Sequence, residues 1–161
     1  MQNVISANEY DSVALDVDVT GIRILSNSIF ANGDLGIDLG DDGPTANDPG
    51  DKDTGVNALQ NKPLLSSAKK GATGTTTVRG TLNSTPGKTF QVQFFSNPSG
   101  TNEGKTLVGS KSVSTNGKGN ASIAFSTKKA IRLGQNITAT ATSTSTGDTS
   151  EFSAPRKVVS A

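Results

Sequence analysis

The chain has 161 residues, a net charge of +1, 32% hydrophobic and 18% charged residues, and neither Cys nor His. The lack of Cys and His excludes disulfides, thiol nucleophiles, the usual zinc sites and a Ser-His-Asp triad. The abundance of Gly, Ser, Thr and Asn favours strands joined by tight turns over helices. No apolar run reaches 18 residues, so the sequence predicts no membrane span.

The N-terminal part of the chain contains an internal repeat. The segment NVISAN at 3–8 recurs as NSIFAN at 27–32, and the same offset carries Val13 onto Ile37. A fixed period of short strands and turn residues is typical of a stacked β-solenoid, and because the pattern starts within a repeat we expect a longer coil. We expect strands at 4–6, 13–17, 22–25, 28–30 and 37–39.

The repeat also predicts which side chains stack. Ile5 should lie on Ile29 inside the coil, and Leu15 on Leu39, while Ser28 should lie on the opposite, solvent-facing side of its strand. The repeated Asn residues at 3 and 27 should stack at a turn, where Asn tolerates the left-handed conformation and can bond to its neighbour in the stack.

Residues 41–62 are acidic and rich in Gly and Pro, with no strand or helix pattern. Between 51 and 57, side-chain oxygens fall at alternate positions, and Ca²⁺ prefers six to eight oxygen ligands. The alternative is that these carboxylates cap loop backbone in Asx-turns, and the segment lacks the Glu and flanking helices of an EF-hand. The candidate Ca²⁺ ligands are Asp41, Asp42, Asp48, Asp51, Asp53 and Asn57.

Residues 63–161 contain seven short alternating segments separated by turn clusters, a pattern typical of a β-sandwich. In the segment 90–95, for example, Phe90, Val92 and Phe94 share one face. We expect strands at 64–68, 76–82, 90–95, 107–113, 121–125, 136–142 and 151–158.

Charge is divided unevenly along the chain. Residues 1–53 hold eleven carboxylates and two basic residues (−9), and residues 54–161 hold three carboxylates and thirteen basic residues (+10). The basic half should attract an anionic polysaccharide or cell-surface glycan, although ordinary solvation explains the same charges. Nucleic acid is not expected, because no recognition motif or interleaved aromatics are present. The candidate polyanion-binding residues are Lys69, Lys70, Arg79, Lys88, Lys128, Lys129 and Arg132.

Two segments carry a resemblance to a known family. GDLGIDLGDDGPTANDPGDKDTGVNALQNKPLL at 33–65 resembles a segment of bacterial secreted or surface proteins, often described as adhesin-like, that contain right-handed parallel β-helices. In that family the segment closes the coil and leads into an immunoglobulin-like β-sandwich. ITATATSTSTGDTSEFSAP at 137–155 is similar to the last hairpin of that sandwich.

The resemblance implies an all-β fold with terminal right-handed β-helix rungs at 1–40, an acidic connecting loop at 41–62 and an immunoglobulin-like sandwich at 63–161. It also implies an extracellular or cell-surface location, but no reaction. We therefore expect a non-catalytic module that supports adhesion or binds an anionic polysaccharide. The alternatives are an accessory C-terminal part of a polysaccharide-degrading β-helix enzyme, or a purely structural cap and spacer.

Two further expectations concern chemistry and assembly. Neutral-sugar sites usually use Trp or Tyr as stacking platforms, and the chain has no Trp and one Tyr, so such a site is disfavoured. Asp41 and Asp42 could be read as a catalytic acid and base, but adjacent loop residues need not face one site. The exposed edge of the first strand and the opposite charges of the two halves both favour self-association.

Overall fold

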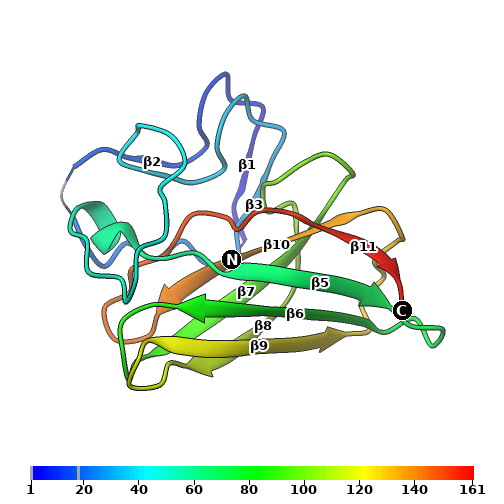
Figure 1. Ribbon diagram of the computed structural model, residues 1–161. Helices are drawn as coiled ribbons and strands as arrows, with labels where there is room; N and C mark the ends of the chain where they lie inside the picture. Colours follow the sequence, from blue (N-terminus) through cyan, green and yellow to red (C-terminus); the bar gives the residue numbers. More distant parts are fainter. Residues whose placement is uncertain (1, 18) are drawn as a thin grey trace.

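The computed structural model describes residues 2–17 and 19–161 and is all-β. In the described residues, a large mixed sheet of seven strands is nearly closed, and two short two-stranded sheets accompany it (Figure 1). One 3₁₀ helix, η1 (Val56–Leu59), lies in the acidic segment. Within these ranges, no helix has the length and apolar character needed to cross a bilayer.

The four short strands of the N-terminal repeat form parallel pairs at the predicted offset. Strand β1 (Val4–Ser6) pairs with β3 (Ser28–Phe30), and β2 (Ala14–Leu15) pairs with β4 (Asp38–Leu39). Ile5 lies opposite Ile29 and Leu15 opposite Leu39, which confirms the predicted stacking. These side chains belong to one apolar cluster, so the repeat encodes a shared core.

Asn side chains form ladders between the two turns. Asn3 Nδ2 donates to Asn27 Oδ1 (3.1 Å), and Asn8 Nδ2 donates to Asn32 Oδ1 (2.8 Å). The predicted stacking and hydrogen bonding of Asn3 with Asn27 are therefore confirmed, but neither residue adopts the left-handed conformation. Each bond joins equivalent positions of the repeat, so the ladders reinforce the same register as the strands.

The strand expected at 22–25 does not form. The backbone N–H of Ile22 donates to Asn57 Oδ1 (2.9 Å), and that of Ile24 donates to Thr149 Oγ1 (3.0 Å). Side chains from distant segments therefore satisfy the donors that a neighbouring strand would otherwise have taken.

The large sheet contains every strand after residue 63. Its order is β8-β7-β10-β11-β5-β6-β9, and all neighbours are antiparallel except β11 and β5. Its two edges approach each other, since Thr127 Oγ1 at the end of β9 donates to Val108 O of β8 (3.2 Å). The strands are β5 (Leu64–Lys70), β6 (Thr76–Asn83), β7 (Thr89–Asn97), β8 (Thr106–Ser114), β9 (Asn120–Thr127), β10 (Asn136–Ser143) and β11 (Arg156–Ser160).

Strand β10 is buried on both faces. Its Ile137, Ala139 and Ala141 belong to the core enclosed by the large sheet. On the other face, Thr138 Oγ1 donates to Glu103 O (2.5 Å) and so lies under the β7–β8 loop. A β-strand with both faces covered implies a second layer outside the large sheet.

That second layer is the coil of β1–β4. Ile29 and Gly104 exchange two backbone hydrogen bonds (3.0 and 2.9 Å), and Ser28 Oγ donates to Lys105 O (2.6 Å). Gly104 is required here, because a Cβ would lie 2.4 Å from the Phe152 ring. Ser28 is 8% exposed. The expectation that Ser28 faces solvent is therefore wrong, because the β7–β8 loop of the large sheet covers that side of β3.

Candidate functional site

The structure divides the predicted Ca²⁺ ligands between two places. Carboxylate oxygens of Asp48, Asp51 and Asp53 lie within 4.8 Å of one another, and we call these residues the loop cluster. Asp41 lies elsewhere, in a second group with Asp11 and Asp38. Asp42 is exposed and belongs to neither group as the structure describes them.

Within the loop cluster, Asp51 is tied into the fold by three donors. Its Oδ1 accepts the Asn61 N–H (2.7 Å), and its Oδ2 accepts Gln60 Nε2 (2.8 Å) and the Ser84 hydroxyl. Burial raises the pKa of Asp51, and the hydrogen bond from Ser84 opposes that shift. Asp51 therefore acts as a structural acceptor that joins the acidic segment to the end of β6.

The other members of the loop cluster are less fully bonded. Asp48 Oδ2 accepts the Lys52 N–H (2.9 Å), which is the backbone capping anticipated as the alternative to metal binding. Asp53 Oδ1 is buried, and no described residue bonds to it; burial, together with the charges of Asp48 and Asp51, raises the pKa of Asp53. Calcium binding at the loop cluster stays a prediction.

Asn57 serves as a hydrogen-bonding bridge. It is fully buried; its Oδ1 accepts the Ile22 N–H, and its Nδ2 donates to Ile22 O (2.8 Å) and Thr149 O (3.2 Å). Its φ of 47° lies in the left-handed region, which Asn tolerates. These bonds connect the acidic segment to the segment before β3 and to the segment after β10, and they occupy both polar atoms of the Asn57 side chain.

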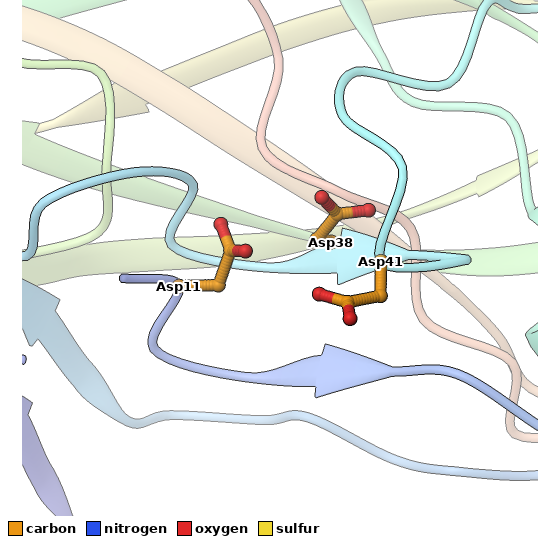
Figure 2. Close-up of side chains that lie close together, drawn as sticks. All are labelled: Asp11, Asp38 and Asp41. Carbon is orange, nitrogen blue, oxygen red and sulfur yellow. The ribbon is translucent and has the colours of Figure 1, made fainter. Parts of the chain in front are cut away.

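The second group, which we call the rung cluster, consists of Asp11, Asp38 and Asp41 (Figure 2). Asp38 lies on β4, Asp11 comes from the turn before β2, and Asp41 follows β4. Carboxylate oxygens of the three residues lie within 4.8 Å of one another. Asp11 and Asp38 were not among the predicted ligands. The repeat gives no signal for them, because the position equivalent to Asp11 in the next turn is Leu35.

Asp38 is the most unusual member of the rung cluster. Asp38 is 2% exposed. Its Oδ2 accepts the Gly43 N–H (3.0 Å), and its Oδ1 has no hydrogen-bond partner among the described residues. Burial raises the pKa of Asp38, and the charges of Asp11 and Glu151 act in the same direction. Asp11 Oδ1 accepts the Leu35 N–H (2.6 Å).

The rung cluster opens into a surface pocket of about 560 Å³. Four carboxylate residues line this pocket, since Asp34 joins the three members of the cluster, and Asn102 reaches it from the β7–β8 loop. All of the charged groups in the lining are acidic. The pocket can therefore receive a cation through oxygen ligands, and an anion would be repelled.

Glu151 and Lys62 form a neutral pair beside β4. Lys62 Nζ lies 2.5 Å from Glu151 Oε2, and this is the one ion pair found in the described residues. Glu151 is 4% exposed and also accepts the Thr45 N–H (3.1 Å). This ion pair attaches the end of the acidic segment to the segment before β11. In the described ranges, no basic side chain forms an ion pair with the rung cluster.

The register of the large sheet gathers most of the predicted polyanion-binding residues at one end. Strand β5 ends there and β9 ends beside the start of β6, since Lys70 pairs with Thr76 and Thr76 with Thr127. Lys70 Nζ donates to Ile131 O (2.6 Å) in the loop after β9. We call this group the basic end, and it consists of Lys69, Lys70, Lys128, Lys129 and Arg132.

Two predicted residues lie outside the basic end. Arg79 is exposed on the outer face of β6, midway along the strand. Lys88 lies in the turn between β6 and β7, at the opposite end, where its carbonyl accepts the Thr115 N–H (2.9 Å). The acidic segment reaches that same opposite end, because Gly50 N–H donates to Asn83 Oδ1 (2.7 Å). The protein therefore has an acidic end and a basic end.

Comparison with known proteins adds no family to this description, since neither the scan against protein-family models nor the search of curated proteins gives a match. We therefore infer the function from the geometry of the two carboxylate clusters and the basic end.

Proposed function

We propose that the chain is a non-catalytic module of a secreted or cell-surface protein, and that it supports adhesion by binding anionic polysaccharide at its basic end. In this proposal β1–β4 are terminal rungs of a right-handed parallel β-helix. Residues 63–161 are an immunoglobulin-like sandwich that the rungs hold in place. The parallel register between equivalent positions of the repeat supports the first assignment.

The strand order supports the second assignment. Strands β5, β6 and β9 make one antiparallel group, and β8, β7, β10 and β11 make the other. The parallel contact between β5 and β11 joins the two groups at one side. In an immunoglobulin-like sandwich the chain likewise crosses between two antiparallel sheets by Greek-key connections, with a core made by alternate residues of both.

The clustering of cations at the basic end is the observation that carries the proposed function. Between residues 54 and 147 the sequence has a single carboxylate, Glu103, which is 5% exposed and accepts a hydrogen bond from Asn32 (2.6 Å). The basic end therefore has no carboxylate from this stretch to neutralise it at the surface. A positive field of this kind raises the local concentration of sulfated or uronic polymers.

Two of the lysines are held in defined positions. Lys70 Nζ donates to Ile131 O, and Lys129 Nζ donates to Leu107 O (2.9 Å). An ammonium has three donors, so each of these groups keeps donors for a sulfate or carboxylate oxygen. Fixing the side chains beforehand lowers the conformational entropy that binding would otherwise cost.

The proposal is tested by surface plasmon resonance on immobilised heparin, polygalacturonate and neutral dextran. The variant combines Lys128→Gln, Lys129→Gln and Arg132→Gln, and the control, which removes two positive charges at the opposite end, combines Lys88→Gln and Lys118→Gln. Since an exposed ion pair contributes up to ~1 kcal/mol, we expect the triple variant to lose about tenfold or more in affinity for both polyanions.

We expect the control variant to bind within about twofold of the parent, which is within the range of ordinary surface substitutions. Binding should also weaken as salt is raised, because the screening length falls to about 8 Å at 0.15 M. Equal losses in the two variants, or equal binding to dextran, would reject the basic end as the binding surface. Absence of binding to either polyanion would favour the structural cap and spacer.

A further inference from the structure

The rung cluster contains a buried acceptor that the fold leaves without a hydrogen bond. Asp38 is 2% exposed, and its Oδ1 has no partner among the described residues, although its Oδ2 accepts the Gly43 N–H. Buried polar atoms in folded proteins are nearly always bonded, so each exception requires an explanation. A carboxylate can only accept, and therefore the missing partner is a donor or a cation.

The surroundings of Asp38 favour a cation. Asp11 and Asp41 bring carboxylate oxygens within 4.8 Å, and Asp34 lines the same pocket. The described residues contain one ion pair, between Lys62 and Glu151, so no lysine or arginine is paired with these three carboxylates. Three ionised carboxylates at this separation repel one another unless a positive charge lies between them.

From this arrangement we propose that Asp11, Asp38 and Asp41 bind a Ca²⁺ ion that joins the two rungs of the coil to the start of the acidic segment. Carboxylates are hard oxygen ligands, and the chain has no His or Cys that would select a softer metal. The pocket provides room for the remaining ligands, which the Asn102 amide oxygen and water can supply.

The site has a structural consequence because its ligands come from separate turns of the coil. Asp11 precedes β2, and Asp38 lies in β4, which pairs with β2. Asp41 adopts a left-handed conformation (φ 54°) at the start of the acidic segment. A bound Ca²⁺ therefore holds three stretches of backbone together, and its binding energy stabilises the rungs against separation.

The sequence provides a spectroscopic probe for this site. Tyr10 is the single Tyr, the chain has no Trp, and Tyr10 is adjacent to Asp11. Its carbonyl accepts the Asp34 N–H (3.4 Å), so the residue lies beside the pocket. Tb³⁺ replaces Ca²⁺ at oxygen sites, and excitation of a neighbouring tyrosine makes bound Tb³⁺ luminesce. Luminescence excited through Tyr10 therefore reports on this pocket.

The test measures Ca²⁺ binding to the full chain by calorimetry, and Tb³⁺ luminescence with competition by Ca²⁺. Asp38→Asn preserves the shape and the acceptor for Gly43 but removes the charge, and Asp42→Asn is the matched control because Asp42 is exposed and belongs to neither cluster. We expect Asp38→Asn to weaken binding at this site by about tenfold or more, and Asp42→Asn to change it by about twofold or less.

Two further variants keep the test decisive. Asp41→Asn removes an exposed ligand from a left-handed position that Asn tolerates, so it should weaken Ca²⁺ binding even if Asp38→Asn fails to fold. Asp53→Asn examines the loop cluster and should leave the Tyr10-excited luminescence unchanged. The proposal is overturned if the chain binds no Ca²⁺, if Asp41→Asn and folded Asp38→Asn bind like the parent, or if Asp53→Asn alone abolishes the luminescence.

Discussion

Replacing Asp38 with Asn should stabilise the Ca²⁺-free protein but not the Ca²⁺-bound protein. In the metal-free protein, Asp38 is 2% exposed, and its carboxylate oxygens lie within 4.8 Å of those of Asp11, so the two charges repel whenever both groups are ionised. Two unit charges at that distance repel by roughly 3.5 kcal/mol at an effective dielectric constant of 20. Because Asp11 is half-buried, water reduces this repulsion further.

We therefore expect Asp38→Asn to raise the free energy of unfolding of the chelated protein by about 1–2 kcal/mol, which corresponds to roughly 3–6 °C in Tm for a domain of this size. The Asn oxygen can still accept the Gly43 N–H, so no native hydrogen bond is lost. In excess Ca²⁺ this advantage should largely disappear, since the parent gains about 2.7 kcal/mol at a hundredfold excess over its Kd, whereas a variant that binds tenfold more weakly gains about 1.4 kcal/mol.

Differential scanning calorimetry of both proteins, in chelator and in excess Ca²⁺, measures this change in their relative stability. Asp42→Asn is again the control, and it should follow the parent under both conditions because Asp42 is exposed and lies outside the cluster. If Asp38→Asn is less stable than the parent in chelator, the ionised cluster does not destabilise the metal-free fold. In that case the electrostatic reasoning is refuted.

Three other predictions follow from the packing and charges. Ile29→Ala should lower the free energy of unfolding by about 2–5 kcal/mol, because it leaves a cavity. Ser28→Asp should also lower it, because it buries a charge between β3 and the β7–β8 loop. Urea unfolding measures both, and a Ser28→Asp variant as stable as the parent would contradict this packing. The folded protein raises the pKa values of Asp38, Asp51 and Asp53, so these carboxyl groups bind protons more tightly in the folded than in the unfolded chain. The stability that these groups contribute is present below their ordinary pKa of 3.8 and is lost as pH rises through their folded pKa values. Acidifying the chelated protein should therefore raise this part of its stability. In urea titrations, Asp38→Asn should flatten the dependence of the free energy of unfolding on pH. Light scattering should show association between acidic and basic ends that dissolves at 1 M salt, where screening shortens to about 3 Å, while pairing through the edge of β1 should persist; a monomer at both salts would contradict both routes.

The sequence was sufficient to predict the all-β class and the pairing within the coil. An internal repeat specifies which positions stack, because equivalent residues of successive turns must share one core. This is why Ile5 lies opposite Ile29 and Asn3 bonds to Asn27. Alternation similarly predicted that Phe90 and Phe94 share one face, and both belong to the core enclosed by the large sheet.

The sequence did not predict the contact between strands β1–β4 and the large sheet. Periodicity distinguishes two faces of a strand, but it does not say whether another layer covers the polar face. Ser28 is buried because Lys105, 77 residues away, accepts its hydrogen bond. The N–H groups of segment 22–25 likewise bond to distant side chains, so a strand pattern there produced no strand.

The candidate sites were predictable as residue types but not as constellations. The composition of residues 41–62 indicated an acidic segment that could hold a cation. Only the fold separated Asp41 from Asp51 and placed Asp41 with Asp11 and Asp38. In the same way, composition gave a basic half, and strand register gathered five of its cations at one end. Local patterns are encoded within a few residues or one repeat, whereas a binding site depends on which distant turns meet, and long-range packing decides that.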